Sequence, residues 1–229
     1  MLDLRVKRNF IRHFQIQPIA NSRWMANRIR ESSLFSQVAS TPIVPPMVGN
    51  AFFAENISDI CAELGIPENR TFISLGARSL DDRFKGIPEF LEHLSRETDL
   101  ADKLTVLLFG DGRIEVPANL DVRLLGNITD PHKLAKVYHT SAMFISPSKM
   151  ETFGMTLAEA QACGTPVVAF DVGGIRDAVA VEDTGTLVQS GDFLGLFAHL
   201  KNVISKPEWF KASDPSAEIG WQHDFTQIT

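Results

Sequence analysis

From residue 70 onward, two kinds of segment alternate along the chain. Short apolar runs with few polar interruptions occur at residues 71–75, 105–109, 122–125, 143–146, 167–170 and 186–188. Such runs are typical of strands buried on both faces, as in a parallel sheet covered by helices. Segments with helical spacing lie between them, at residues 87–96, 131–138, 156–163, 175–180 and 193–204. This alternation predicts an α/β fold with a doubly wound, mainly parallel, Rossmann-like sheet.

The first 50 residues are organised differently. Residues 17–20 have the pattern of a strand end, and Ser22 is placed to cap a helix that runs to about residue 32. The paired prolines at positions 45 and 46 exclude helix and predict a linker. Residues 1–50 carry seven basic against two acidic side chains, whereas the remainder carries fifteen against twenty-six. We therefore expect a structural boundary near residue 50.

The basic segment at residues 5–14 allows two interpretations. It could form a helix that lies on a membrane surface. It could also be the solvated face of a helix whose apolar side packs on protein outside this chain. We favour the second interpretation.

Composition and charge exclude several classes of protein. The chain has 229 residues with 44% hydrophobic and 22% charged residues, as in a globular protein, and no apolar run is long enough to span a bilayer. A net charge of −6 argues against nucleic-acid binding, which requires a basic surface. Two distant cysteines, Cys61 and Cys163, indicate neither a zinc site nor a disulfide framework. We expect a reducing, cytoplasmic location.

The strongest chemical signal lies in residues 146–160, where a predicted strand, a loop and a helix follow one another. Gly154 leaves room for a ligand beside the backbone, and the N–H groups of Met155 and Thr156 would face an anion at the helix start. Glu151 and Glu159 can border the same ligand, since carboxylate oxygens suit vicinal hydroxyls. A structural alternative exists, because Thr156 and Glu159 have the spacing of a capping box.

These residues also carry a resemblance to a known family. The pair Glu151 and Glu159, separated by seven residues, is followed by the run EAQACGTPVVA, which begins at Glu159. This block closely resembles the nucleotide-sugar-binding half of glycosyltransferase family 4, also called group 1, which are retaining enzymes of the GT-B fold. The resemblance implies that Glu159 binds the nucleotide ribose and that Glu151 faces the donor hexose. It also implies that the backbone of residues 154–156 holds the diphosphate and sugar.

A second block agrees with the family pattern, in the loop after the predicted strand 71–75. The family places an arginine and a lysine there, which stabilise the charge that develops on the departing diphosphate. Lys85, directly before Gly86, matches the lysine. Arg78 and Arg83 compete for the arginine, and we prefer Arg78 because it lies where the strand ends. The resemblance then implies that no tightly bound metal or other cofactor is needed.

The family pattern extends to a third loop and to the ends of the chain. Gly126 and Ile128 match a segment whose backbone contacts the nucleobase. Residues 1–50 would be the remnant of an acceptor domain with its linker, residues 51–206 the donor-binding domain, and residues 207–229 a C-terminal tail. The chain would thus be the second half of a GT-B enzyme, and the missing N-terminal acceptor domain would be its partner.

The function implied is the donor-binding domain of a retaining glycosyltransferase, inactive alone. The whole enzyme would move a hexose from a nucleoside diphosphate sugar to a hydroxyl acceptor, as in polysaccharide biosynthesis. Its missing half could contact the inner face of the membrane. Two alternatives stay open, a non-catalytic sugar-nucleotide-binding module and a GT-B sugar-nucleotide epimerase.

Overall fold

The structure is a computed structural model that describes residues 4–36, 38, 40–53, 57–66, 70–180 and 184–205. The predicted tail at residues 207–229 lies outside this range. The strands are β1 (Thr71–Ser79), β2 (Leu104–Asp111), β3 (Asp121–Gly126), β4 (Met143–Ser146), β5 (Val167–Phe170) and β6 (Gly185–Val188). The α-helices are α1 (Leu4–His13), α2 (Arg23–Glu31), α3 (Cys61–Leu64), α4 (Ile87–Arg96), α5 (Thr98–Ala101), α6 (Pro131–Thr140), α7 (Met155–Ala162) and α8 (Phe193–Ser205), and two short 3-10 helices are η1 (Asn50–Phe53) and η2 (Ile175–Asp177).

All six strands form one parallel sheet in the order β3-β2-β1-β4-β5-β6. The chain winds outward from β1 to β3, returns to the middle at β4, and winds outward to β6 on the other side. The doubly wound α/β fold predicted from the sequence is therefore confirmed. In such a sheet the order of strands reverses between β1 and β4, and ligands bind outside the carboxyl ends of the strands at this switch point.

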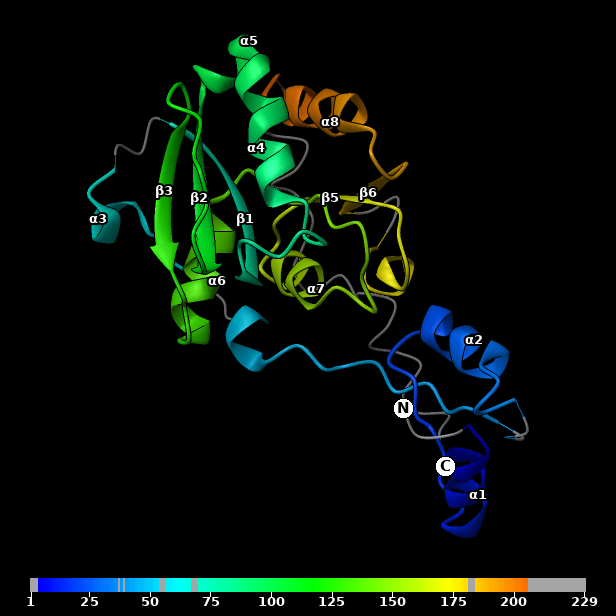
Figure 1. The fold of residues 1–229 in the computed structure, drawn as a ribbon. Helices are drawn as coiled ribbons and strands as arrows, with labels where there is room; N and C mark the ends of the chain where they lie inside the picture. The colour runs from blue at the N-terminus through cyan, green and yellow to red at the C-terminus, as the bar shows by residue number, and fades with distance from the viewer. Residues whose placement is uncertain are drawn as a thin grey trace.

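Helices cover both faces of the sheet, so that three layers enclose two hydrophobic cores (Figure 1). One core holds residues of η1, α3, α6 and α7, and the other holds residues of α4, α5 and α8. Strand β2 shows how one strand feeds both cores, because Val106 and Leu108 belong to one and Leu107 and Phe109 to the other. In a strand buried on both faces, the side chains at successive positions all point into a hydrophobic core, which explains the continuous apolar runs in the sequence.

Helices α1 and α2, before residue 50, lie outside the sheet (Figure 1). The predicted cap of α2 is confirmed, since the Ser22 hydroxyl accepts a hydrogen bond from the Met25 N–H over 3.1 Å. The predicted strand end at residues 17–20 is a single parallel bridge between Ala20 and Ile43. Helix α1 has no buried residue. No helix in the described ranges is long and apolar enough to cross a membrane.

Two predicted boundaries differ from the structure. Strand β1 continues to Ser79, beyond the predicted end at residue 75, because β2 extends alongside it to Asp111 with a register irregularity between Gly76 and Ser79. The predicted helix at residues 175–180 is only the 3-10 turn η2. The other predicted strands and helices agree with the structure to within about two residues at each end.

Candidate functional site

The loops after β1 and β4 meet at the switch point of the sheet. Lys85 lies in the loop after β1 and Glu151 in the loop after β4, and Lys85 Nζ is 2.6 Å from Glu151 Oε2. Both side chains are partly shielded, with 29% of Lys85 and 19% of Glu151 exposed. Two residues that the sequence separates by 66 positions are thus brought into direct contact where a ligand is expected.

The loops after β1, β4 and β5 are tied together through their backbones. The Lys149 N–H donates to the Phe84 carbonyl over 2.7 Å, which joins the first two loops. The Gly174 N–H donates to the Glu151 carbonyl over 2.9 Å, which joins the last two. A Cβ atom on Gly173 would lie 1.9 Å from the Glu151 carbonyl oxygen, so this approach requires glycine. These contacts fix the backbone that carries Glu151.

Helix α7 begins directly beside Glu151. Its N-terminal cap is Gly154, with φ of 105°, a backbone conformation that residues with a Cβ rarely adopt. The Gly154 carbonyl accepts from the N–H groups of Leu157 and Ala158, whereas no described residue accepts from those of Met155 and Thr156. The positive end of the helix dipole and these two donors together provide the setting for an anion.

The capping-box interpretation of Glu159 is wrong. It would make Thr156 the N-cap, but the helix already begins at Met155 after Gly154. Glu159 instead accepts a hydrogen bond at Oε2 from the Tyr138 hydroxyl of α6, over 3.0 Å. Burial raises the pKa of Glu159 above its ordinary value, while the hydrogen bond from Tyr138 acts in the opposite direction. The carboxylate is half-buried and free of any helix-capping role.

The two candidate arginines have different surroundings. Arg78 lies within β1, one residue from its end, and is exposed. No hydrogen bond or ion pair joins its side chain to another described residue. Arg83 is also exposed, and its guanidinium carbon lies 4.9 Å from the centre of the Phe84 ring. Among the described residues, neither arginine forms a hydrogen bond or ion pair with Lys85 or Glu151, so the preference for Arg78 stays a prediction.

The proposed nucleobase segment lies after β3 at the same edge of the sheet. Gly126 ends β3 with φ of 66° and is exposed, while Ile128 is half-buried and packs against the core that contains α6 and α7. Strand β2 separates this segment from β1. The structure therefore places it on the same edge as Lys85 and Glu151, two strands away from β1.

Sequence reasoning missed several residues that support these loops. Tyr138 reaches Glu159 from another helix, and its only signal was a tyrosine at the end of an apolar helix face. Asn21 Nδ2 donates to Thr152 Oγ1 over 3.1 Å. Arg23 donates to both carboxylate oxygens of Asp177, through its backbone N–H and its Nε, each over 2.5 Å. No local pattern could show the last two contacts, since they join positions more than 130 residues apart.

Comparisons with known proteins identify the family of this chain. The family model described as "Glycosyl transferases group 1" matches residues 69–206. A D-inositol 3-phosphate glycosyltransferase of Nocardiopsis dassonvillei is 30% identical over 92% of this chain and 54% of its own length. Another from Catenulispora acidiphila is 37% identical over 64% of this chain and 38% of its own length. The chain thus spans about half, or less, of these curated relatives.

Solved structures of low sequence identity share the fold. The sucrose-phosphate synthase of Thermosynechococcus elongatus aligns with a TM-score of 0.72 at 24% identity, over 91% of this chain and 53% of that one. HepE of Anabaena, solved in complex with UDP and glucose, aligns with a TM-score of 0.70 at 21% identity, over 91% of this chain and 59% of that one. The resemblance in sequence is therefore confirmed by a family match that spans all six strands, and the chain belongs to the group 1 glycosyltransferases.

Proposed function

We propose that this chain is the donor-binding domain of a retaining glycosyltransferase that moves a hexose from a nucleoside diphosphate sugar to a hydroxyl acceptor. Glu159 would hold the ribose hydroxyls, and Glu151 would face the hexose. Lys85 and Arg78 would bind the diphosphate together with the backbone of Gly154, Met155 and Thr156. Gly126 and Ile128 would contact the base.

The observation that carries this proposal is the contact between Lys85 and Glu151 beside the start of α7. A diphosphate needs cations and N–H donors, and a sugar needs carboxylate acceptors. The switch point offers all three, since Lys85 comes from the loop after β1 and Glu151 lies just before the first N–H groups of α7. A cation at this position stabilises negative charge on the leaving diphosphate as the bond to the sugar breaks, which is the usual source of rate enhancement in group transfer.

The ligand-binding role of Glu159 draws support from its surroundings. Its carboxylate does not cap α7 and forms no ion pair with another described residue. One oxygen is occupied by Tyr138, and the other has no partner among the residues that the structure describes. A carboxylate with an open acceptor, one helical turn from an anion-binding helix start, suits a ribose whose phosphates lie at that start.

The proposal also includes a missing partner. Since the relatives are about twice as long, a second domain would supply the acceptor site, and residues 1–50 would be its last part. Transfer requires both substrates to be held in reacting geometry, which contributes up to about 7–11 kcal/mol to barrier lowering. We therefore expect residues 1–229 to bind a donor without transferring its sugar.

Nucleotide binding by the isolated chain tests the proposal directly. UDP, GDP and ADP are added separately in the presence of EDTA, and the unfolding temperature is measured. A ligand at about 100 times its dissociation constant adds roughly 2.7 kcal/mol to the free energy of unfolding. At about 2–4 °C per kcal/mol for a chain of this size, the expected shift is readily measured. Folded protein that shows no shift with any of the three nucleotides would refute the proposal.

A second measurement separates the transferase from the two alternatives. The chain is joined to its upstream acceptor domain and incubated with labelled nucleotide sugar and a panel of hydroxyl acceptors. Transfer supports the transferase. Interconversion of the sugar without an acceptor would favour the epimerase, and binding without turnover would favour the non-catalytic module.

A further inference from the structure

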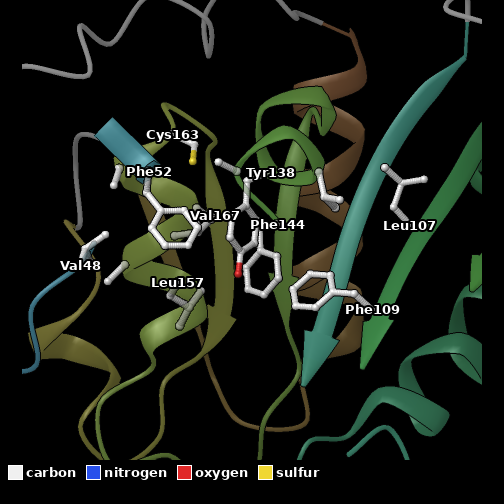
Figure 2. Packing of buried hydrophobic residues seen from close by; sticks show 14 of the residues in the cluster. Val48, Phe52, Leu107, Phe109, Tyr138, Phe144, Leu157, Cys163 and Val167 are labelled. Atoms are coloured by element: carbon white, nitrogen blue, oxygen red, sulfur yellow. The ribbon is translucent and has the colours of Figure 1, made fainter. Parts of the chain in front are cut away.

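Tyr138 lies at the centre of the core between α6, α7 and the sheet. Its side chain has no solvent exposure, and its ring centre lies 6.1 Å from that of Phe52, 5.7 Å from Phe109 and 5.4 Å from Phe144. Figure 2 shows the ring between Phe52 on one side and Phe144 and Phe109 on the other. A tyrosine packed in this way has little freedom to turn, so its hydroxyl occupies a fixed position.

The hydroxyl points at the side chain on which nucleotide binding is proposed to depend. Tyr138 donates to Glu159 Oε2 over 3.0 Å, and this is the hydrogen bond that its hydroxyl forms with the described residues. A phenylalanine would fill the same space without burying a polar atom. Packing alone therefore does not explain why this residue is a tyrosine. The hydrogen bond to Glu159 does explain it.

We propose that Tyr138 is a positioning residue for donor binding, whose hydroxyl fixes the Glu159 carboxylate so that its other oxygen faces the ribose hydroxyls of a nucleotide. This inference rests on the proposed function and deepens it. A glutamate that is only half-buried has several accessible rotamers, and ordering them on binding costs free energy. A rigidly held hydroxyl that already selects one rotamer of Glu159 in the unbound protein removes part of that cost.

The charge of Glu159 supports the same role. Burial raises the pKa of Glu159, and the hydrogen bond from Tyr138 opposes this shift. Among described residues, the titratable group that shifts the pKa of Glu159 is Tyr138 on α6, while Cys163, directly after α7, has its own pKa affected by the charge of Glu159. Burial raises the pKa of both, to about 12 for Cys163, so both are neutral near pH 7. The Tyr138 hydroxyl therefore remains a hydrogen-bond donor, and it favours the ionised form of Glu159, which can accept from ribose hydroxyls.

The test compares ribose and dideoxyribose ligands. Tyr138→Phe removes the hydroxyl and keeps the ring. Ser141→Ala is the matched control, because it removes another buried hydroxyl at the end of α6, which donates to the Val137 carbonyl. Calorimetry measures the affinity of each protein for UDP, GDP and ADP and for their 2′,3′-dideoxy analogues. Tyr138→Phe should weaken binding of the ribonucleotide that the chain prefers by about 2- to 10-fold. It should leave the affinity for the dideoxy analogue unchanged.

A purely structural role would move both affinities together, as a general disturbance of the site does. Equal loss for both ligands, or no loss for either, would overturn the inference while leaving nucleotide binding intact. If the unaltered chain binds none of the six ligands, the proposed function itself fails and this inference with it. Ser141→Ala should bind both kinds of ligand as the unaltered chain does.

A second measurement needs no variant. Tyr138 is the one tyrosine of the chain, so biosynthetic incorporation of 3-fluorotyrosine labels this position alone. The fluorine resonance should shift on addition of the bound ribonucleotide and shift less with its dideoxy analogue, because only the ribose engages Glu159. Identical shifts with the two ligands would overturn the inference even if Tyr138→Phe did not fold.

Discussion

Lys85 allows the proposed diphosphate site to be tested with an internal control. Lys85→Met removes the ammonium group and keeps most of the apolar stem, so packing changes little. Lys149→Met is the matched change. Lys149 Nζ lies 2.6 Å from Glu89 Oε1, the same separation as in the Lys85–Glu151 pair, and its loop is the one that carries Glu151.

The two changes should differ little in stability. The Lys149–Glu89 pair is 42% and 48% exposed, and such surface pairs contribute about 0–1 kcal/mol. The Lys85–Glu151 pair is more shielded, at 29% and 19%, but Glu151 keeps access to water when its partner is removed. We expect a loss of about 1 kcal/mol for Lys85→Met, which corresponds to roughly 2–4 °C in unfolding temperature.

The two variants, Lys85→Met and Lys149→Met, should differ clearly in nucleotide affinity. A hydrogen bond between charged groups contributes about 1.5–3 kcal/mol, so Lys85→Met should weaken diphosphate binding by about 10- to 150-fold. The unpaired Glu151 would add repulsion toward the phosphates. Lys149→Met should change affinity by less than about 2-fold, because neither Lys149 nor its partner Glu89 is among the proposed donor contacts and the pair lies at the surface.

Isothermal titration of both variants with the nucleotide that stabilises the unaltered chain gives the result. Far-ultraviolet circular dichroism checks that each variant remains folded. If Lys85→Met binds as tightly as the unaltered chain, or if Lys149→Met loses as much affinity, Lys85 has no special role in binding phosphate.

Three further outcomes are expected. Because burial raises the pKa of Glu159, the folded chain holds this proton more tightly than the unfolded chain, and stability falls as pH rises through the raised value. Glu159→Gln removes this loss, so its unfolding temperature relative to the unaltered chain should be higher at about pH 7.5 than at about pH 4.5, and an unchanged difference contradicts the assignment. The Cys163 thiol has a pKa of about 12 and is 6% exposed, so iodoacetamide at about pH 8 should label it far more slowly in folded than in urea-unfolded protein. Residues 1–229 should transfer no sugar in a labelled-donor assay, and transfer equal to that of the chain with its upstream domain would show a complete active site.

The order of the helices and strands was predictable because each buried strand corresponds to a short apolar run in the sequence. Strands β4 and β5 are buried at every position, and their apolar runs coincide with their bounds. Strand β1 could not be delimited in this way. Its last part is Gly76 to Ser79, where exposed Arg78 and Ser79 break the apolar pattern while pairing with β2 continues. Pairing depends on a neighbour about 30 residues away, which a local pattern does not contain.

The site was predictable only as far as its motifs are local. Lys85 and Glu151 were identified from separate motifs, and the parallel pairing of β1 with β4 explains why they meet. Glu159 was ambiguous, because the spacing from Thr156 satisfies a capping rule that the backbone does not use. With Gly154 as the N-cap, the helix starts two residues earlier than a cap at Thr156 would allow, and the Glu159 carboxylate accepts from a tyrosine 21 residues away instead.

The contacts made by residues 21–23 matter for how this chain can be divided. A fragment that began at residue 51 would contain every strand of the sheet and every proposed donor contact. It would nevertheless strip Thr152 of its amide partner and leave the Asp177 carboxylate, now only 12% exposed, facing water without its arginine. The Glu151 loop is thus held in part by the segment that charge and prolines assign to another domain. Removing residues 1–50 would therefore keep the sheet but weaken the loops after β4 and β5 that carry Glu151 and Asp177.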